Sequence, residues 1–156
     1  MKSCFDITPE VAHELISINQ ASDTNRANML WFCFFEPHCS DPYGIYRFFK
    51  FWGGEALYNH HVGREKTGNI LMRIGRPCIV KAKVKIEFLK ESYYPCRALA
   101  RVYLSNHGYS INGSIEHEGY STENIQNNNI YEVIEYPSEH FFNLTKCDEW
   151  QGEATL

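Results

Sequence analysis

The sequence contains no long apolar run. No stretch approaches the roughly 20 apolar residues that a membrane-spanning helix needs. Acidic residues also interrupt the N-terminal region, where a secretory leader would be continuously apolar. We therefore expect a cytoplasmic protein that does not associate with a membrane.

Motifs typical of metal and nucleotide sites are also absent. The chain has neither Cys-x-x-Cys nor His-Glu-x-x-His, and neither a phosphate-binding loop nor a dinucleotide-binding fingerprint. Its six cysteines lack the close spacing of a redox or zinc motif, so most are expected to be small core residues. His60 and His61 are adjacent and would point in different directions on a helix, so we expect no metal cofactor.

Positive charge is scarce overall, since 15 Lys and Arg residues face 19 Asp and Glu residues for a net charge of −4. That balance excludes a globally basic nucleic-acid binder. The charge is unevenly distributed, however: it is −3 over residues 1–63, +7 over residues 64–104 and −8 over residues 105–156. The basic segment either packs against the acidic ones or forms a local face for a polyanion, and packing is the simpler interpretation.

Aromatic residues, in contrast, are abundant: ten Phe, ten Tyr and three Trp make up 15% of the 156 residues. With 44% apolar residues, a chain of this length can bury a core of its own. We expect one domain over residues 1–156.

Periodicity and capping residues predict a mixed α+β domain with a largely antiparallel sheet. Helices are expected over residues 8–18, 45–52, 55–61, 95–106 and 138–144. Strands are expected over residues 29–35, 78–86, 114–120 and 130–136, and a charged loop over residues 62–69. Thr8 and Ser138 are the expected N-caps of the first and last helices. The unbroken apolar run at 29–35 predicts a strand buried on both faces.

The strand expected at 78–86 alternates strictly between apolar and basic residues from Val80 onward. One face would hold Val80, Ala82, Val84 and Ile86, and the other Lys81, Lys83 and Lys85. Three lysines on one sheet face, about 7 Å apart, would suit the phosphates of a nucleic acid.

A candidate ligand site lies between two apolar helical segments. Trp52 is followed by Gly53 and Gly54, and Tyr58 comes one turn later. Two glycines allow a sharp turn or the close approach of a ligand to the backbone. A plain helix-breaking turn explains the same pattern equally well.

A candidate acid–base pair is formed by Glu116 and Glu118. In a strand, two residues at this spacing share one face about 7 Å apart. If partly buried, the two carboxylates would repel and raise at least one pKa, which suits proton transfer or the stabilisation of a cation. Two solvated glutamates on an edge strand are the simpler alternative.

The order of these features over residues 30–136 resembles the ADP-ribosyltransferase fold of small bacterial toxins. The shared features are a short strand, a helix, a glycine turn into an Ala-x-Tyr helix, a strand and a late Glu-x-Glu. The resemblance implies a split, mostly antiparallel sheet with flanking helices that binds NAD in a cleft. It also implies that Glu118 stabilises the ribosyl cation as nicotinamide leaves, with Glu116 on the acceptor side. Tyr58 would pack on the nicotinamide.

Other parts of the family pattern are missing. The family holds the NAD phosphates with an Arg or His on its first core strand, and residues 30–35 have neither. His38, just beyond that strand, or Arg47 on the following helix is the expected substitute. No Ser-Thr-Ser stands in the middle strand, where Ile79-Val80-Lys81 occurs instead. Trp52, Gly53 and Gly54 complete the expected NAD-binding set.

The first functional hypothesis is an NAD-dependent ADP-ribosyltransferase that acts as an intracellular toxin. It would belong to a toxin–antitoxin or phage-defence system, modify a nucleic acid or a protein, and be held in check by an antitoxin partner. One alternative is a non-catalytic module that binds protein or RNA through its aromatic residues and basic face. Another is a metal-independent ribonuclease that uses His and Glu as acid and base.

Overall fold

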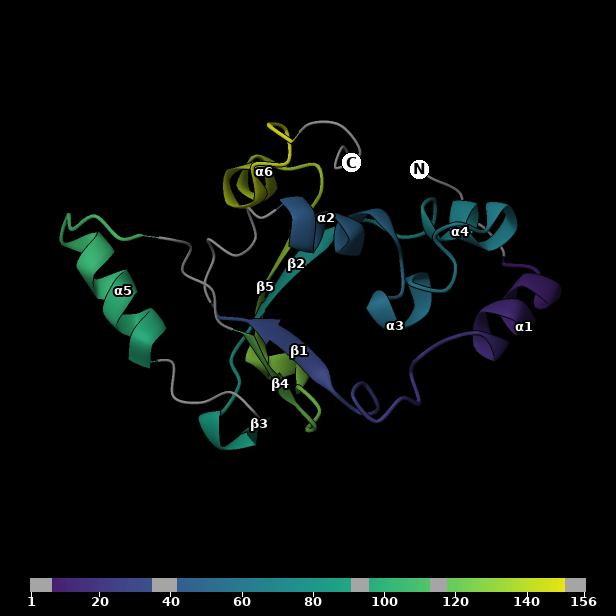
Figure 1. Ribbon diagram of the computed structural model, residues 1–156, viewed down its shortest axis with the longest axis horizontal. Helices are drawn as coiled ribbons and strands as arrows, with labels where there is room; N and C mark the ends of the chain where they lie inside the picture. The colour runs from purple at the N-terminus through teal and green to yellow at the C-terminus, as the bar shows by residue number, and fades with distance from the viewer. Residues whose placement is uncertain (1–6, 35–41, 91–95, 113–117, 151–156) are drawn as a thin grey trace.

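The structure is a computed structural model that describes residues 7–34, 42–90, 96–112 and 118–150. Helices and strands are interleaved along the chain (Figure 1). The helices are α1 (Pro9–Ser17), α2 (Pro42–Lys50), α3 (Glu55–Tyr58), α4 (Glu65–Leu71), α5 (Cys96–Asn106) and α6 (Glu139–Thr145). The strands are β1 (Leu30–Cys33), β2 (Cys78–Ala82), β3 (Leu89–Lys90), β4 (Glu118–Ser121) and β5 (Ile130–Glu135). Two short 3₁₀ helices, η2 (Ile86–Phe88) and η3 (Asn127–Asn129), precede β3 and β5.

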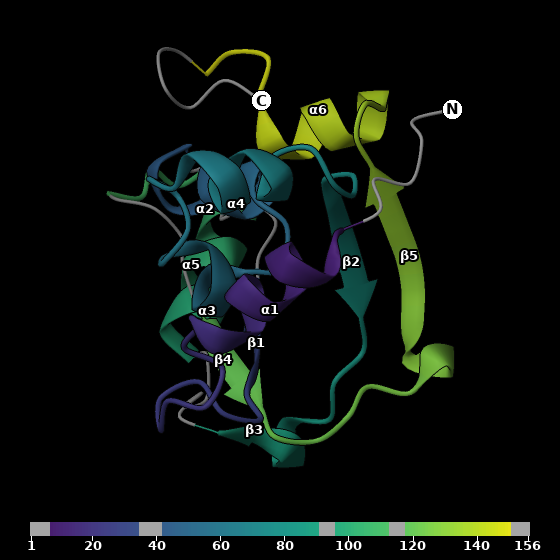
Figure 2. The same cartoon turned by 90° about the vertical axis from the view of Figure 1, so that its right-hand side faces the viewer.

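The strands form two small antiparallel sheets. One has three strands in the order β1-β4-β3, and the other pairs β2 with β5. In both views the β1-β4-β3 sheet lies toward the lower end of the molecule, and α2, α4 and α6 lie toward the upper end (Figures 1 and 2). The expected α+β class and antiparallel pairing are therefore confirmed.

Local sequence signals determine where the first and last helices begin. The Thr8 hydroxyl accepts a hydrogen bond from the Val11 N–H at 3.4 Å, and Pro9 opens α1. The Ser138 hydroxyl accepts a hydrogen bond from the Phe141 N–H at 3.2 Å at the start of α6. Both expected N-caps are confirmed.

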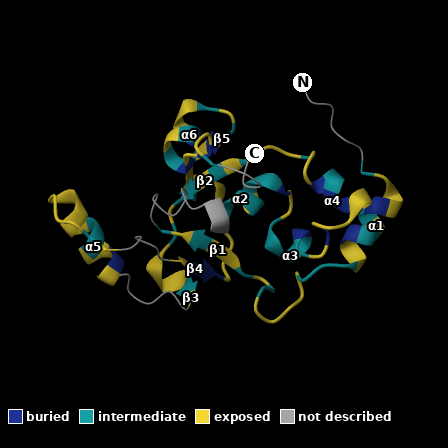
Figure 3. Cartoon of the chain, turned by 45° about the horizontal axis from the view of Figure 1, so that its top comes forward, coloured by how far each residue is buried: buried dark blue, intermediate teal, exposed yellow. Residues whose placement is uncertain are grey.

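Two clusters of buried side chains form the core (Figure 3). The first joins α1, α3 and α4 and comprises Val11, Leu15, Phe51, Tyr58 and Leu71. The second joins β5 and α6 and comprises Ile134, Phe141 and Cys147. In Figure 2, α3 lies on the left, β5 lies on the right and α1 lies between them.

Two expectations about single elements are wrong. The charged segment at 62–69 is not all loop, because α4 begins at Glu65 and buries Thr67, Gly68 and Leu71. Its charged residues occupy the outer face of the helix, which a count of charges does not distinguish from a loop. Strand β1 is not buried on both faces, since Leu30 is 46% and Trp31 50% exposed.

Strand β2 is shorter than expected and its apolar face is reversed. It ends at Ala82, with a register shift between Lys81 and Ala82. Ile79 pairs with the buried Ile134, whereas Val80 is 51% exposed. The three lysines do not share one face of a strand, because β2 ends at Ala82. Lys81 lies within β2, and Lys83 and Lys85 follow it.

Helix α5 stands apart from the other helices (Figure 1). Leu99 and Tyr103 are 53% and 62% exposed, and Ala98 is the buried residue among those of α5. Exposure also corrects the cysteine prediction: Cys33, Cys78 and Cys96 are exposed, and Cys147 is buried. None of the described helices has the length and apolar character that crossing a membrane requires.

Candidate functional site

A groove of about 680 Å³ opens where the end of α2, the turn after α4 and the start of β2 come together. Trp52, Gly53 and Gly54 line it, so the structure brings together three of the residues predicted to bind NAD. Both glycines have positive φ angles, 93° and 72°, in the turn that leads into α3. We call this the Trp52 groove.

The position of the Trp52 indole depends on Gly75 across the groove. Gly75 has a φ of 74°, and a Cβ atom there would lie 2.8 Å from Cδ1 of Trp52. The backbone N–H of Trp52 donates a hydrogen bond to the Leu71 carbonyl at 2.9 Å, which connects this residue to the end of α4. Trp52 is 51% exposed, so part of its surface is accessible to a ligand.

Three basic side chains, Lys50, Arg73 and Arg76, also line the Trp52 groove, and no Asp or Glu of the described residues does. Arg76 lies 3.5 Å from Glu135, but both side chains are at least 60% exposed, so this pair is weak. Arg73 makes no ion pair within the described part of the chain. An aromatic surface beside the guanidinium groups of Arg73 and Arg76 suits a ligand that has a ring and phosphate groups.

Tyr58 does not line this groove. It is 1% exposed, and its ring centroid lies 5.8 Å from that of Phe48 and 5.7 Å from that of Phe51. Burial raises the pKa of the Tyr58 phenol from 10.0 to about 12, and the Arg47 charge lowers it by less. Tyr58 is therefore a core residue, and an NAD-stacking role would need its ring to be uncovered.

Arg47 is engaged within the protein. Its guanidinium carbon lies 4.7 Å from the Tyr58 ring centroid, and its Nη2 donates a hydrogen bond to Oδ1 of Asn59 at 3.0 Å. Nearby, Arg26 donates to Glu55 at 2.8 Å, and this hydrogen bond is the main reason that the pKa of Glu55 is lowered. To bind the phosphates of NAD, Arg47 would have to give up its contacts with Tyr58 and Asn59.

Glu118 is not among the residues lining the Trp52 groove. It is an exposed residue of β4 and the strand partner of Cys33. Directly opposed residues of antiparallel strands point to the same face, so the Glu118 side chain lies on the Cys33 side of this sheet. Cys33 lines a second groove of about 530 Å³, together with residues of β2. Glu116 and His38, the other predicted site residues, lie outside the described residues.

The predicted nucleic-acid lysines have different partners. Lys81 is only 17% exposed and lies 3.3 Å from Glu132, which also lies 3.2 Å from His140. Lys85 lies 3.3 Å from Glu87. Lys83 lies over the Tyr131 ring, 6.0 Å from its centroid. Lys81 is therefore part of an ion-pair cluster, and Lys83 and Lys85 remain at the surface.

No family model, curated protein or solved structure matches this chain.

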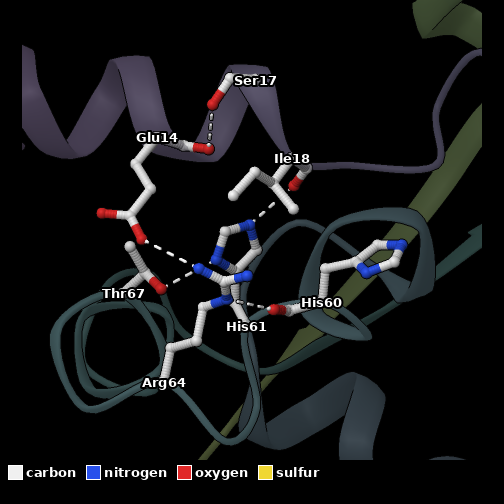
Figure 4. A network of polar contacts seen from close by, with 7 residues as sticks. All are labelled: Glu14, Ser17, Ile18, His60, His61, Arg64 and Thr67. Carbon is white, nitrogen blue, oxygen red and sulfur yellow. Dashed lines mark hydrogen bonds and ion pairs between the residues drawn. The ribbon is translucent and has the colours of Figure 1, made fainter.

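His61 has a structural position that the sequence did not reveal (Figure 4). It is fully buried, and its Nδ1 and Nε2 atoms lie 2.8 Å from Oγ1 of Thr67 and 2.8 Å from the carbonyl oxygen of Ile18. Because a carbonyl oxygen only accepts, Nε2 is the donor to Ile18. This histidine links the end of α1 to α4, and no group of metal-binding side chains occurs among the described residues.

The sequence did not reveal that Arg73 and Arg76, candidate phosphate contacts beside the lysines, belong to the Trp52 groove. Arg73 and Arg76 flank Gly75 in the short segment between α4 and β2. Their spacing around a glycine was the available signal. Only the fold shows that this segment faces the Trp52–Gly54 turn.

Proposed function

We propose that the Trp52 groove binds NAD and that the protein is an ADP-ribosyltransferase. The observation that carries the proposal is the exposed Trp52 indole beside Arg73 and Arg76. None of the described residues that line this groove is an Asp or a Glu. NAD has two aromatic bases joined through a pyrophosphate. One base would stack on the indole, and the basic side chains would contact the phosphates.

In the proposed transfer of the ADP-ribosyl group, Glu118 is the catalytic residue. The bond between C1′ of the ribose and the nicotinamide nitrogen breaks, and nicotinamide leaves with the bonding electrons. The acceptor then forms a bond to C1′ and releases its proton. A carboxylate beside C1′ stabilises the ribosyl cation in this step. The proposal requires the nicotinamide ribose to reach the Cys33 side of the β1–β4 pair, where Glu118 lies.

The biological setting follows from the same proposal. A small enzyme that consumes NAD and modifies a macromolecule would be toxic to the cell that makes it. We therefore place it in a toxin–antitoxin or phage-defence system, with an antitoxin protein as its partner. Arrest of growth on expression, absent in Glu118→Gln, is the expected cellular result.

Calorimetric titration with NAD tests the binding part. Replacing Trp52 by Ala should weaken binding by about 5- to 150-fold, because stacking of a base on an aromatic ring contributes about 1–3 kcal/mol. Trp31→Ala is the matched control, since Trp31 is 50% exposed but lies in β1, outside the groove. Equal affinities for the Trp52→Ala and wild-type proteins would refute the site.

Incubation with labelled NAD and a cell extract tests the transfer part. Glu118→Gln should abolish labelling while NAD affinity stays unchanged, because the carboxylate acts on the transition state and not on the bound ground state. Glu149→Gln, an exposed change near the C-terminus, should label normally. Normal labelling by Glu118→Gln would remove that residue from catalysis without affecting the binding result.

A further inference from the structure

A second ligand surface runs along the end of β2, apart from the Trp52 groove. Two grooves of about 530 and 460 Å³ adjoin there and share Lys83 and Val84 in their linings. The first continues toward Cys33 and Tyr131, and the second toward Lys85 and Phe88. We call these two grooves together the Lys83 surface.

Each groove contains an ammonium group close to an aromatic ring. Lys83 Nζ lies 6.0 Å from the centroid of the Tyr131 ring, and Lys85 Nζ lies 5.3 Å from that of Phe88. Tyr131 is 61% and Phe88 37% exposed. Exposed rings beside positive charge are the arrangement that single-stranded nucleic acids use, because bases stack on the rings and phosphates contact the cations.

Residues with side-chain amides line the second groove. They are Asn124, Gln126 and Asn129. An amide both donates and accepts hydrogen bonds, which matches the mixed donors and acceptors on the edge of an unpaired base. The backbone N–H of Lys83 donates a hydrogen bond to the backbone carbonyl of Asn129 at 2.8 Å. This bond holds Asn129 next to Lys83.

The charge of the Lys83 surface is modest. Glu87 lies 3.3 Å from Lys85, with both side chains at least 65% exposed, and Glu123 also lines the second groove. Duplex binding depends mainly on many phosphate contacts, which this surface does not supply. Stacking on Tyr131 and Phe88 would therefore contribute much of the affinity, and stacking requires unpaired bases.

We propose that the Lys83 surface binds single-stranded nucleic acid, with bases stacked on Tyr131 and Phe88 and the phosphates at Lys83 and Lys85. Oligonucleotide binding at this surface does not require the NAD site. The two are connected by position: Cys33, the strand partner of Glu118, lines the same groove as Lys83. If Glu118 acts as proposed above, a strand bound there would lie on the same side of the β1–β4 pair as this carboxylate, as the acceptor of the ADP-ribosyl group must.

Fluorescence anisotropy with labelled ten-nucleotide RNA, its DNA equivalent and a duplex of the same sequence tests the proposal. Both single strands should bind more tightly than the duplex, and the tighter of the two identifies the natural strand type. Tyr131→Ala and Phe88→Ala should each weaken binding by about 5- to 150-fold. Lys83→Glu should weaken it further by reversing a charge at the centre of the surface.

Two control variants separate this surface from the rest of the molecule. Tyr103→Ala changes a tyrosine that is 62% exposed on α5, and it should bind the oligonucleotides normally. Trp52→Ala should also bind them normally while losing NAD. Thermal unfolding of Tyr131→Ala, Phe88→Ala and Lys83→Glu checks that loss of binding is not loss of fold. The proposal is wrong if no oligonucleotide binds, if the duplex binds equally well, or if Trp52→Ala abolishes binding.

Discussion

At the scale of single residues, His61 joins two helices through one buried ring. Its two nitrogen atoms contact the Ile18 carbonyl and the Thr67 hydroxyl, and Arg64 closes the same region by donating to Glu14 at 3.4 Å (Figure 4). The adjacent His60 is exposed. The two adjacent histidines are thus one structural residue and one surface residue.

Replacement of His61 by Ala should lower the free energy of unfolding by about 2–4 kcal/mol, because two buried polar groups lose their partners. His60→Ala should change it by less than about 0.5 kcal/mol, as expected of a surface substitution. Urea unfolding of both variants measures the difference. Equal stability of the two would mean that the His61 hydrogen bonds contribute nothing.

Tyr58 should make the protein sensitive to alkali. Its pKa is raised to about 12 in the folded state by burial, so between pH 10 and 12 the unfolded chain loses this proton before the folded one does. The stabilisation is complete below pH 10 and is lost as the pH rises toward 12. Denaturant unfolding of wild type and Tyr58→Phe over this range should show a steeper loss for wild type, by about 1–3 kcal/mol. Parallel curves would contradict the assignment.

At the scale of elements, α4 depends on close contact between its backbone and the segment before it. A Cβ atom at Gly68 would lie 2.4 Å from the carbonyl oxygen of His61, and that atom belongs to the backbone. This contact explains why a glycine stands within a helix, where it costs about 1 kcal/mol relative to alanine.

Gly68→Ala should therefore destabilise the protein by about 1–3 kcal/mol, although alanine is the better helix former. Gly63→Ala is the control, because nothing lies within 4 Å of a Cβ at that position. Thermal unfolding compares the two variants. A Gly68→Ala protein more stable than wild type would show that the helix moves away freely.

The elements that could be predicted are those set by local signals. The caps at Thr8 and Ser138, the turn at Gly53 and Gly54, and the strand ending before Pro137 depend on residues next to each other in sequence. The face of β2 could not be predicted, because the buried partner Ile134 lies far along the chain and selects Ile79 in place of Val80. Helix α4 was missed because its buried residues are few and Thr67 and Gly68 are not apolar.

At the scale of the whole molecule, the fold distributes the basic segment of residues 64–104 in two ways. Lys81 forms an ion pair with Glu132, and Arg64 forms one with Glu14. In both pairs the partner lies far away in the sequence. Arg73 and Lys83 instead lie on two separate surfaces, the Trp52 groove and the Lys83 surface. Pairing with acidic residues therefore accounts for part of the basic segment, and Arg73 and Lys83 are the residues on which the two proposed ligand sites depend.

The candidate site was predicted only where its residues are contiguous. Trp52, Gly53 and Gly54 meet in one groove, but Tyr58 from the next turn packs into the core because α3 turns its ring toward Phe51. Glu118 lies in a strand whose position depends on pairing with β1, and sequence alone could not place it relative to Trp52.

The most direct test of the account is the effect of NAD on the indole N–H signals in a ¹⁵N correlation spectrum. The chain has three tryptophans, Trp31, Trp52 and Trp150, so three signals are expected, each assigned by a Trp→Phe variant. The account predicts that NAD shifts the Trp52 signal in a saturable manner and leaves that of Trp31 in place. An unchanged Trp52 signal at saturating NAD would contradict it.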